Sequence, residues 1–350
     1  MKVVVDQDIK HFEEIVGLID WLRPIDFIYA KSKDINSDLV KDAEVILVRS
    51  TVEVNQNLLN NSATKLVGSA TAGFDHIDSK YLYKKNIDWF HAPGCNSSSV
   101  VHYVLSCISF LVKNKLFDIN NTVGIIGCGN VGSKLRIALN DLGIKNKTYD
   151  PFLDMDFLTN INDIKTCELI SLHTPLTSNS KYPTINMLDS SFIEILKNKI
   201  LINTARGGIV DESAVVRNKD LIYLSDVWNN EPVPNKTLID RSLIATPHIA
   251  GHSFDGKING TIKLITKLLE YINQEDEVTN TLNIINNHFS LNSKDQKYLD
   301  INEYFNKYNV INESNKFKRL YKESAEEDLE KTFKKLRSNH PLRRDVMDYQ

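Results

Sequence analysis

The chain has few cysteines, and none of them belongs to a recognisable motif. Only four occur in 350 residues, and no pair has the CxxC spacing of a zinc site or a redox centre. They are Cys95, Cys107, Cys128 and Cys167. Isolated thiols argue against a disulfide framework and a structural zinc site, and they fit a reducing cytosol. We therefore expect no metal site.

Long apolar runs are also missing. The longest apolar stretch lies near residues 104–112, far short of the ~20 residues that a helix needs to span a bilayer. The N-terminus, MKVVVDQD, carries acidic residues too early for a secretory leader. These features predict a cytoplasmic protein that does not insert into a membrane.

The chain lacks an excess of charge of either sign. Its formal net charge is −3, and its 42 lysines and arginines are scattered along the sequence. A nucleic-acid partner would need a clustered basic surface, so none is expected. An anionic small-molecule substrate would have to be bound by a few local positive groups. The length allows about two or three domains.

The sequence does contain a regular alternation of short β-branched runs with helix-length amphipathic segments. Runs such as VGII and ILVR are apolar throughout, which is typical of parallel strands covered on both faces. The predicted strands form two series, one at 2–5, 27–29, 45–48, 66–68 and 88–90, and one at 122–126, 147–149, 169–172, 200–202, 221–225 and 243–245. Alternating strands and helices predict an α/β fold with two doubly wound, Rossmann-like domains.

We expect one long buried helix at about 98–113 to bridge the two domains, and a second helix at about 255–273 to follow the last strand of the second series. We expect a first domain made of residues 1–94 plus 255–277, and a second domain over residues 95–254.

After about residue 277 the composition changes. Residues 278–350 are polar and rich in Asn and Lys. A partial helical spacing of apolar residues persists there, at Leu320, Leu329, Phe333 and Leu336. We expect a small appended module, and the alternative is a solvated, partly disordered tail.

The strongest single motif is TVGIIGCGNVG at 122–132, a GxGxxG that follows a predicted strand and opens a helix. Gly127 permits a tight turn, Gly129 lets the backbone approach a pyrophosphate, and Gly132 lets the helix pack on the strand. The first amides of that helix, around Asn130 and Val131, would bind the phosphates. Glycine triplets also occur in ordinary turns, so the motif depends on this context.

An acid in the expected place supports a dinucleotide. Asp150 ends the next strand, KTYD, about 20 residues after the glycines, where it would bind the adenine ribose hydroxyls. Its charge would repel a 2′-phosphate, which favours NAD over NADP. The alternative is a turn aspartate before Pro151.

Three later segments, 200–212, 221–232 and 243–253, each place polar residues directly after a buried strand. Ligands of doubly wound sheets bind beyond the carboxyl ends of the strands. The residues that we expect to converge there are Arg206, Asp226, Glu231 and His248.

Each residue type suits one task in the oxidation of an alcohol. His248 would take the hydroxyl proton, and Glu231 would hold its second ring nitrogen. Arg206 offers a planar fork for a carboxylate. Asp226 would accept from the nicotinamide amide. Taken singly, each is equally explained as an ordinary loop or packing residue, so the prediction depends on the set.

Other histidines compete for the role of base. His252 lies four residues after His248 and is a direct rival, whereas His173 ends a predicted strand and is expected to play a supporting role. The remaining candidates, which we expect to be surface or packing residues, are His11, His76, His91 and His102.

The motifs GCGNVG, HTPLT, NTARGG, DVWNNEP and TPHIAG resemble those of the D-isomer-specific 2-hydroxyacid dehydrogenases. Within that family, VVVDQDI, ILVRSTVEVN, VGSATAGFDHID and APGCNSSSVVHYV are similar to the branch that oxidises 4-phospho-D-erythronate in vitamin B6 biosynthesis. The resemblance covers about residues 1–275 and returns over 333–345.

The resemblance implies roles for individual residues. The catalytic residues would be Arg206, Glu231 and His248. The cofactor contacts would include Asp150, Thr174, Thr204, Ala205, Asp226 and Gly251. The substrate contacts would be Ser50, Thr71 and His252, the last at a position where that branch typically has a tyrosine.

The resemblance also implies the organisation of the chain. The first domain would bind substrate, residues 95–254 would bind NAD, and the C-terminal module would be an α+β dimerisation module of a homodimer. If the module also reaches the partner's site, the residues to test are Arg337, Arg343 and Arg344.

Two other functions remain open. The substrate could be a different 2-hydroxy acid, such as 3-phosphoglycerate. The chain could also be an NAD-sensing regulatory protein on the same scaffold, which the complete Arg206–Glu231–His248 set disfavours.

Overall fold

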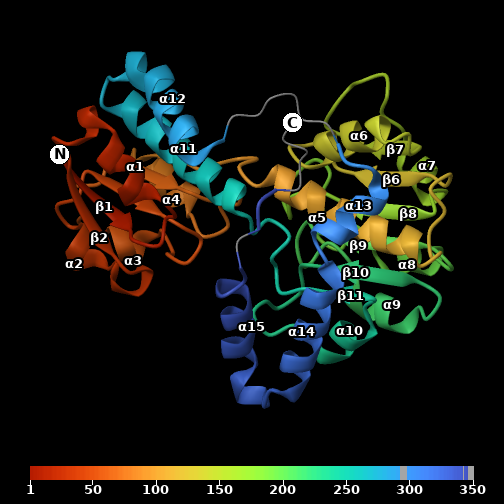
Figure 1. Cartoon of the computed structure of the whole chain (residues 1–350). Helices are drawn as coiled ribbons and strands as arrows, with labels where there is room; N and C mark the ends of the chain where they lie inside the picture. Colours follow the sequence, from red (N-terminus) through yellow and green to blue (C-terminus); the bar gives the residue numbers. More distant parts are fainter. Residues whose placement is uncertain (292–297, 342, 346–350) are drawn as a thin grey trace. The chain divides into compact units, whose positions relative to one another are not determined.

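The chain divides into two compact units in the computed structural model, which describes residues 1–291, 298–341 and 343–345 (Figure 1). Unit 1 comprises Met1–Asn96 and Ser253–Lys294, and unit 2 comprises Ser97–His252 and Asp295–Gln350. Each unit is built on its own parallel sheet, so each is described by itself.

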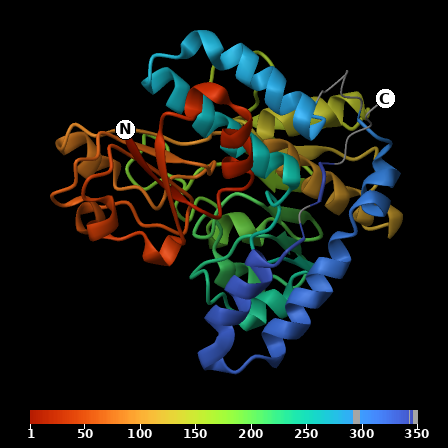
Figure 2. The same ribbon diagram turned by 60° about the vertical axis from the view of Figure 1, so that its left-hand side comes forward.

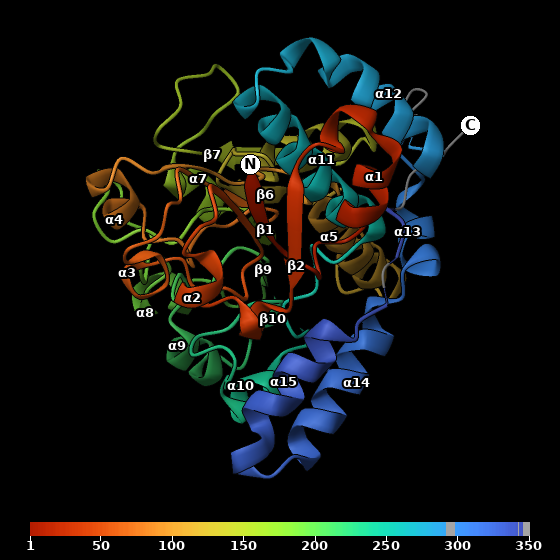
Figure 3. The ribbon, with the colours of Figure 1, turned by 90° about the vertical axis from the view of Figure 1, so that its left-hand side faces the viewer.

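Unit 1 contains a five-stranded sheet in the order β2-β1-β3-β4-β5. Its strands are β1 Lys2–Asp6, β2 Asp26–Ala30, β3 Val45–Val48, β4 Leu66–Ser69 and β5 Asp88–Phe90. All neighbours are parallel, and β1 and β2 lie side by side in Figure 3. The chain starts at β1, adds β2 on one side and then β3 on the other, so the winding direction reverses between β1 and β3.

Helices cover both faces of this sheet because its central strands are apolar on both sides. One face packs Val3, Val5 and Leu47 against α1 and α11, and the other buries Val4, Ile46 and Val67. The helices of unit 1 are α1 Phe12–Leu18, η1 Asp20–Leu22, η2 Ser32–Asp34, α2 Ser37–Val40, α3 Gln56–Leu59, α4 Ser79–Lys84, α11 Phe254–Tyr271, η3 Glu275–Glu277 and α12 Val278–Phe289.

Unit 2 contains a six-stranded parallel sheet in the order β11-β10-β9-β8-β6-β7. Its strands are β6 Val123–Ile126, β7 Asn146–Tyr149, β8 Leu169–Leu172, β9 Ile200–Asn203, β10 Ile222–Ser225 and β11 Ile244–Ala245. The winding direction reverses between β6 and β8. Ligands of such sheets bind at this switch point, and the glycine motif follows β6, one of the two strands that form it.

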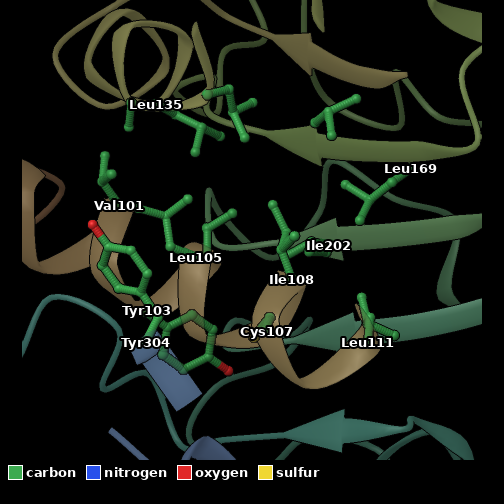
Figure 4. Packing of buried hydrophobic residues seen from close by; sticks show 14 of the residues in the cluster. Val101, Tyr103, Leu105, Cys107, Ile108, Leu111, Leu135, Leu169, Ile202 and Tyr304 are labelled. Carbon is green, nitrogen blue, oxygen red and sulfur yellow. The ribbon is translucent and has the colours of Figure 1, made fainter. Parts of the chain in front are cut away.

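The long helix α5, Ser97–Lys113, is the core of one face of unit 2. Figure 4 shows its side chains Val101, Leu105 and Ile108 packed with Leu135 and Ile202. The helix is apolar on nearly every side, and this explains why it is buried all round instead of exposing one polar face. The other helices before residue 252 are α6 Gly132–Asp141, α7 Ile161–Lys165, α8 Ser190–Glu194, α9 Glu212–Arg217 and α10 Lys236–Arg241.

The C-terminal segment packs onto unit 2 as helices. These are α13 Ile301–Lys307, α14 Val310–Glu323, η4 Glu326–Asp328 and α15 Leu329–Ser338. Tyr304 joins the core around α5, while α14 and α15 form a hairpin (Figure 2) that buries Phe317 and Phe333 against the opposite face of the sheet.

The predicted α/β fold with two doubly wound units is confirmed, and all eleven predicted strands are present, with ends that shift by at most one residue. The sequence suggests a single module over 278–350. In the structure, α12 adds Ile285 to the core of unit 1, whereas residues between 298 and 336 add to the cores of unit 2.

Within the described residues, no helix is long and apolar enough to cross a membrane. The same residues contain no cluster of three or more His, Cys, Asp or Glu side chains suited to a metal ion.

Two glycines in helices of unit 1 predict opposite effects of the same substitution. Gly260→Ala should destabilise the protein by about 1–3 kcal/mol, because a Cβ on Gly260 would lie 2.5 Å from the carbonyl oxygen of Ala70. Gly17→Ala should stabilise it by about 0.5–1 kcal/mol, because a Cβ there would meet nothing within 4 Å. Urea unfolding followed by circular dichroism measures both. Equal effects of the two substitutions would contradict the close approach of α11 to β4.

Candidate active site

The glycine turn of unit 2 has the geometry that its sequence predicts. Gly127 has a φ of +93°, and a Cβ on Gly132 would lie only 1.8 Å from the carbonyl oxygen of Gly127. A Cβ on Gly129, by contrast, would meet no atom within 4 Å, so open space lies over that part of the turn. The N-cap residue of α6 is Val131, whose side chain cannot accept a hydrogen bond from the first amides of the helix. The first amides of α6 are therefore suited to bind an anion.

Asp150 lies directly beside this turn. Its carboxylate accepts hydrogen bonds from the amide of Cys128 at 2.8 Å and from the amide of Phe152 at 3.0 Å. The structure thus brings the predicted acid to the predicted turn, where its remaining lone pairs suit ribose hydroxyls.

Thr174 follows β8 on the other side of the turn. A Cβ on Gly127 would lie 2.9 Å from the Thr174 methyl group, and the buried Thr174 hydroxyl has no hydrogen-bond partner among the described residues. A buried hydroxyl without a partner is rare in a protein, and a bound nucleotide would satisfy it. The residues around the turn therefore fit a dinucleotide.

His173 joins the ends of β8 and β9. Its Nε2 lies 2.9 Å from the Ser171 hydroxyl, and its Nδ1 lies 3.4 Å from the hydroxyl of Thr204. Burial lowers the pKa of His173 to about 3, so the ring is neutral at physiological pH. This supports the expected role of a supporting residue, because a ring that stays neutral is a poor proton acceptor.

The loop after β9 presents Arg206 on a turn shaped by Asn203. The Asn203 side chain accepts from the amide of Ala205 at 3.1 Å and donates to the carbonyl of Arg206 at 3.2 Å. A Cβ on the next residue, Gly207, would lie 2.0 Å from the carbonyl oxygen of Trp228, so this loop packs flush against the loop after β10.

The loop after β10 and the loop after β11 meet at Glu231 and His248. The Glu231 Oε2 atom lies 2.7 Å from His248 Nδ1, and the second oxygen accepts from the amide of Trp228 at 2.9 Å. A carboxylate can only accept, so Nδ1 carries the proton and Nε2 is the nitrogen available for proton transfer. Both side chains are partly exposed, at 30% for His248 and 21% for Glu231. The pair is therefore accessible to a small molecule.

Glu231 is held in its charged form. Burial alone would raise the pKa of Glu231, but the charge of His248 and its hydrogen bond outweigh burial, with help from the Trp228 amide and the charge of Arg337. The net result is a lowered pKa, which keeps the carboxylate ionised beside the imidazole.

Asp226 holds the loop that carries His248. One carboxylate oxygen accepts from the Thr246 hydroxyl at 2.6 Å and from the amide of Ile249 at 2.7 Å, and the other accepts from the amide of Ala250 at 2.8 Å. The amide of His248 donates to the Asp226 carbonyl at 2.8 Å. Asp226 is only 1% exposed, so each of these bonds lies inside the protein. His248 itself has a φ of +58°, a conformation that such bonds must maintain.

Two aromatic side chains reinforce the same loop. The Trp228 indole donates to the Thr246 carbonyl at 2.9 Å. The Tyr103 hydroxyl from α5 lies 2.7 Å from the Thr246 hydroxyl, and it is the donor because the single Thr246 proton goes to Asp226.

Glu212 and Asn229 were not singled out by their sequence. The Asn229 amide donates to Glu212 at 2.7 Å, and its side chain accepts from the amide of Gly208. Burial raises the pKa of Glu212 to about 7; the Asn229 amide opposes this shift and the nearby charge of Glu231 adds to it. No sequence signal distinguishes Glu212 from an ordinary acid in the first turn of a helix.

The remaining predicted residues lie as follows. Gly251 and His252 end the loop that carries His248. The Arg343 guanidinium of the same chain donates to backbone carbonyls of this loop. In unit 1, Ser50 and Thr71 each lie two residues after the end of a strand, β3 and β4 respectively, and these strands are neighbours. Ser50 is exposed, and the Thr71 hydroxyl donates to the Gly73 carbonyl at 2.8 Å.

Unit 2 thus combines three features at the carboxyl edge of one sheet. They are a dinucleotide turn, an arginine on a tightly packed loop, and an imidazole backed by a carboxylate. Such an arrangement can bind an anionic group and transfer a proton at Nε2 next to a bound dinucleotide.

Comparison with known proteins agrees with this chemistry. Residues 115–250 match the D-isomer specific 2-hydroxyacid dehydrogenase NAD binding domain. This match confirms the predicted cofactor, NAD. The fold is similar to the crystal structure of NAD+-bound 3-phosphoglycerate dehydrogenase from Entamoeba histolytica, with a TM-score of 0.66 and 26% identity over 78% of this chain and 95% of that one.

Curated relatives are more similar still. The erythronate-4-phosphate dehydrogenase of Hahella chejuensis is 39% identical over 281 residues, which cover 78% of this chain and 72% of the relative. The enzyme of the same name from Bacteroides thetaiotaomicron is 33% identical over 365 aligned positions, which cover 100% of this chain and 98% of the relative. The chain therefore belongs to the erythronate-4-phosphate dehydrogenases, within the D-isomer-specific 2-hydroxyacid dehydrogenase family.

Proposed function

We propose that this chain oxidises the C2 hydroxyl of 4-phospho-D-erythronate with NAD. The products would be 2-oxo-3-hydroxy-4-phosphobutanoate and NADH, in a step of pyridoxal 5′-phosphate biosynthesis. The observation that carries the proposal is the 2.7 Å contact between Glu231 and His248, in a chain that is 39% identical to an erythronate-4-phosphate dehydrogenase.

His248 is the proposed general base. Its Nε2 takes the C2 hydroxyl proton, and the resulting imidazolium is stabilised by Glu231, which already holds Nδ1 in the donor tautomer. NAD, when bound, accepts the hydride that leaves C2. The low pKa of Glu231 matters here because a protonated Glu231 could not stabilise the imidazolium.

Arg206 is the proposed partner of the substrate carboxylate. A guanidinium binds a carboxylate through two parallel hydrogen bonds, which determines the orientation as well as the affinity. The Asn203 bonds and the close approach of Gly207 to Trp228 support this role, because they restrict how far the arginine-bearing loop can move.

The cofactor contacts are proposed around the glycine turn. The backbone of Gly127 to Gly132 would bind the pyrophosphate, Asp150 the adenine ribose, and Thr174 a further nucleotide oxygen. The other proposed contacts are Asn130, Val131, Thr204, Ala205, Asp226 and Gly251. Residues 95–254 are accordingly the proposed NAD-binding domain.

On the substrate side, we propose contacts from Ser50, Thr71 and His252, with residues 1–94 and 255–277 as the substrate domain. His252 stands where related sequences typically carry a tyrosine, so it would adjust affinity for the substrate. We further propose a cytoplasmic homodimer, in which residues 278–350 contribute to dimerisation.

A panel of 2-hydroxy acids tests the substrate assignment. We expect NADH formation to be fastest with 4-phospho-D-erythronate and much slower with D-erythronate, which lacks the phosphate. 3-Phosphoglycerate is the direct competitor, because the Entamoeba histolytica enzyme of similar fold is named for it. NADP should support little turnover, because the Asp150 carboxylate beside the glycine turn repels a 2′-phosphate.

The panel also separates the alternatives. Faster turnover of 3-phosphoglycerate would reassign the substrate. NAD binding without turnover of any acid would instead support a regulatory protein.

Substitution of the two neighbouring histidines tests the base. His248→Ala should lower kcat by about 10²–10⁴-fold with the Kd for NAD retained, because only the proton acceptor is lost. His252→Ala should raise the KM for the phosphorylated acid and leave kcat within about 10-fold of the parent. Stopped-flow kinetics and fluorescence titration with NAD measure these quantities. Loss of kcat in His252→Ala alone would move the base to residue 252.

A further inference from the structure

The loop that carries His248 is bound by Arg343 as well as by Asp226. The Arg343 guanidinium donates to the carbonyl of His252 at 2.5 Å and to the carbonyl of Ala250 at 2.8 Å. Its Nη2 atom also donates to the carbonyl of Ser99, at the start of α5, at 2.9 Å. Amides of the loop thus bind the Asp226 carboxylate, and carbonyls of the same loop bind the Arg343 guanidinium.

The surroundings of Arg343 hold its guanidinium in one orientation. The Tyr308 ring lies under it, with 4.3 Å between the guanidinium carbon and the ring centroid. A planar guanidinium stacked on a ring keeps its fork aimed in one direction. Because Ala250 is 1% exposed and Ser99 is fully buried, water cannot readily replace the hydrogen bonds to these two residues.

A second residue of the same segment contacts the loop. The His340 ring lies edge-on to the His252 ring, with 6.4 Å between the centroids. His340 is in turn held by Glu313 of α14 at 3.4 Å. Arg343 therefore contacts the backbone of the loop, and His340 contacts one of its side chains.

We propose that Arg343 is a positioning residue for the reaction: it holds the Ala250 and His252 carbonyls so that His248 stays aligned with Glu231. The bonds fall two and four residues after His248 and bracket Gly251. Loss of the cation would remove the donor that binds the Ala250 and His252 carbonyls, and the loop would shift to hydrate them. This inference rests on the proposed function, because the alignment of His248 matters only if His248 is the general base.

The proposal gives the C-terminal segment a role within its own chain. Both terminal nitrogens of Arg343 donate to backbone carbonyls of unit 2, and its Nε atom is buried. Arg343 therefore acts through the loop and does not touch the reacting atoms.

Arg343→Ala, Arg343→Lys and the control Arg319→Ala test the inference in the full-length protein. Arg319 is an exposed arginine of α14, so Arg319→Ala removes the same charge from the same C-terminal region. We expect kcat of Arg343→Ala to fall about 10–100-fold, the effect of a small misplacement of a catalytic group. Backbone amides of residues 246–252 should exchange hydrogen faster, as measured by mass spectrometry without substrate. Arg319→Ala should match the parent in both.

Chemical rescue separates positioning from general stability. Low-millimolar guanidinium chloride should restore part of kcat and of the amide protection in Arg343→Ala, whereas sodium chloride at equal ionic strength should not. A folded Arg343→Ala with parental kcat and protection would overturn the proposal, as would a loss of kcat that guanidinium leaves unchanged.

Arg343→Lys carries the test if the alanine variant does not fold. Lysine keeps the charge but lacks the planar fork, so it cannot bind three carbonyls in the same geometry. Reduced kcat and partial protection are expected, and parental values would overturn the proposal. If the parent itself fails to oxidise 4-phospho-D-erythronate, the proposed function fails, while the exchange of residues 246–252 still decides the role of Arg343.

Discussion

The buried carboxylate of Asp226 is the constraint on which the rest of the site depends. It accepts from Thr246, Ile249 and Ala250, which together surround His248 in the chain. A carboxylate with three donors inside a protein is held in one orientation, and it imposes that orientation on the loop. Burial raises the pKa of Asp226, and the charge that His248 carries when it is protonated and these three hydrogen bonds oppose the shift without reversing it. The hydrogen bonds that hold the loop in place therefore also favour the ionised form of Asp226, which accepts them.

The catalytic loops are connected to one another as well as to the sheet. Gly207 rests on the carbonyl of Trp228, and the Trp228 indole binds the Thr246 carbonyl. Arg206, Glu231 and His248 are thus carried by three loops that interlock through backbone atoms. Such contacts tolerate little displacement, which suits a reaction that needs a proton acceptor held within hydrogen-bond reach of the substrate.

Local patterns in the sequence were sufficient to predict the fold and part of the site. Apolar runs identify the strands, and GxGxxG with Asp150 identifies the dinucleotide turn, because these features depend on residues close in sequence. The contributions of Arg343, Asn229 and Glu212 depend on tertiary contacts instead. Arg343 lies 91 residues from His252, with which it is bonded, and no local pattern distinguishes it from a charged helix end. The described C-terminal helices likewise find their places only through packing on unit 2.

The most direct test of this account is hydrogen exchange of the Ile249 and Ala250 amides in Asp226→Asn, measured by NMR in the absence of NAD. An asparagine side chain has the same shape but replaces one acceptor oxygen with a donor. The account predicts that at least one of these amides loses protection and that kcat falls about 10–100-fold. Parental protection of both amides together with parental kcat would contradict the claim that Asp226 holds the catalytic histidine in place.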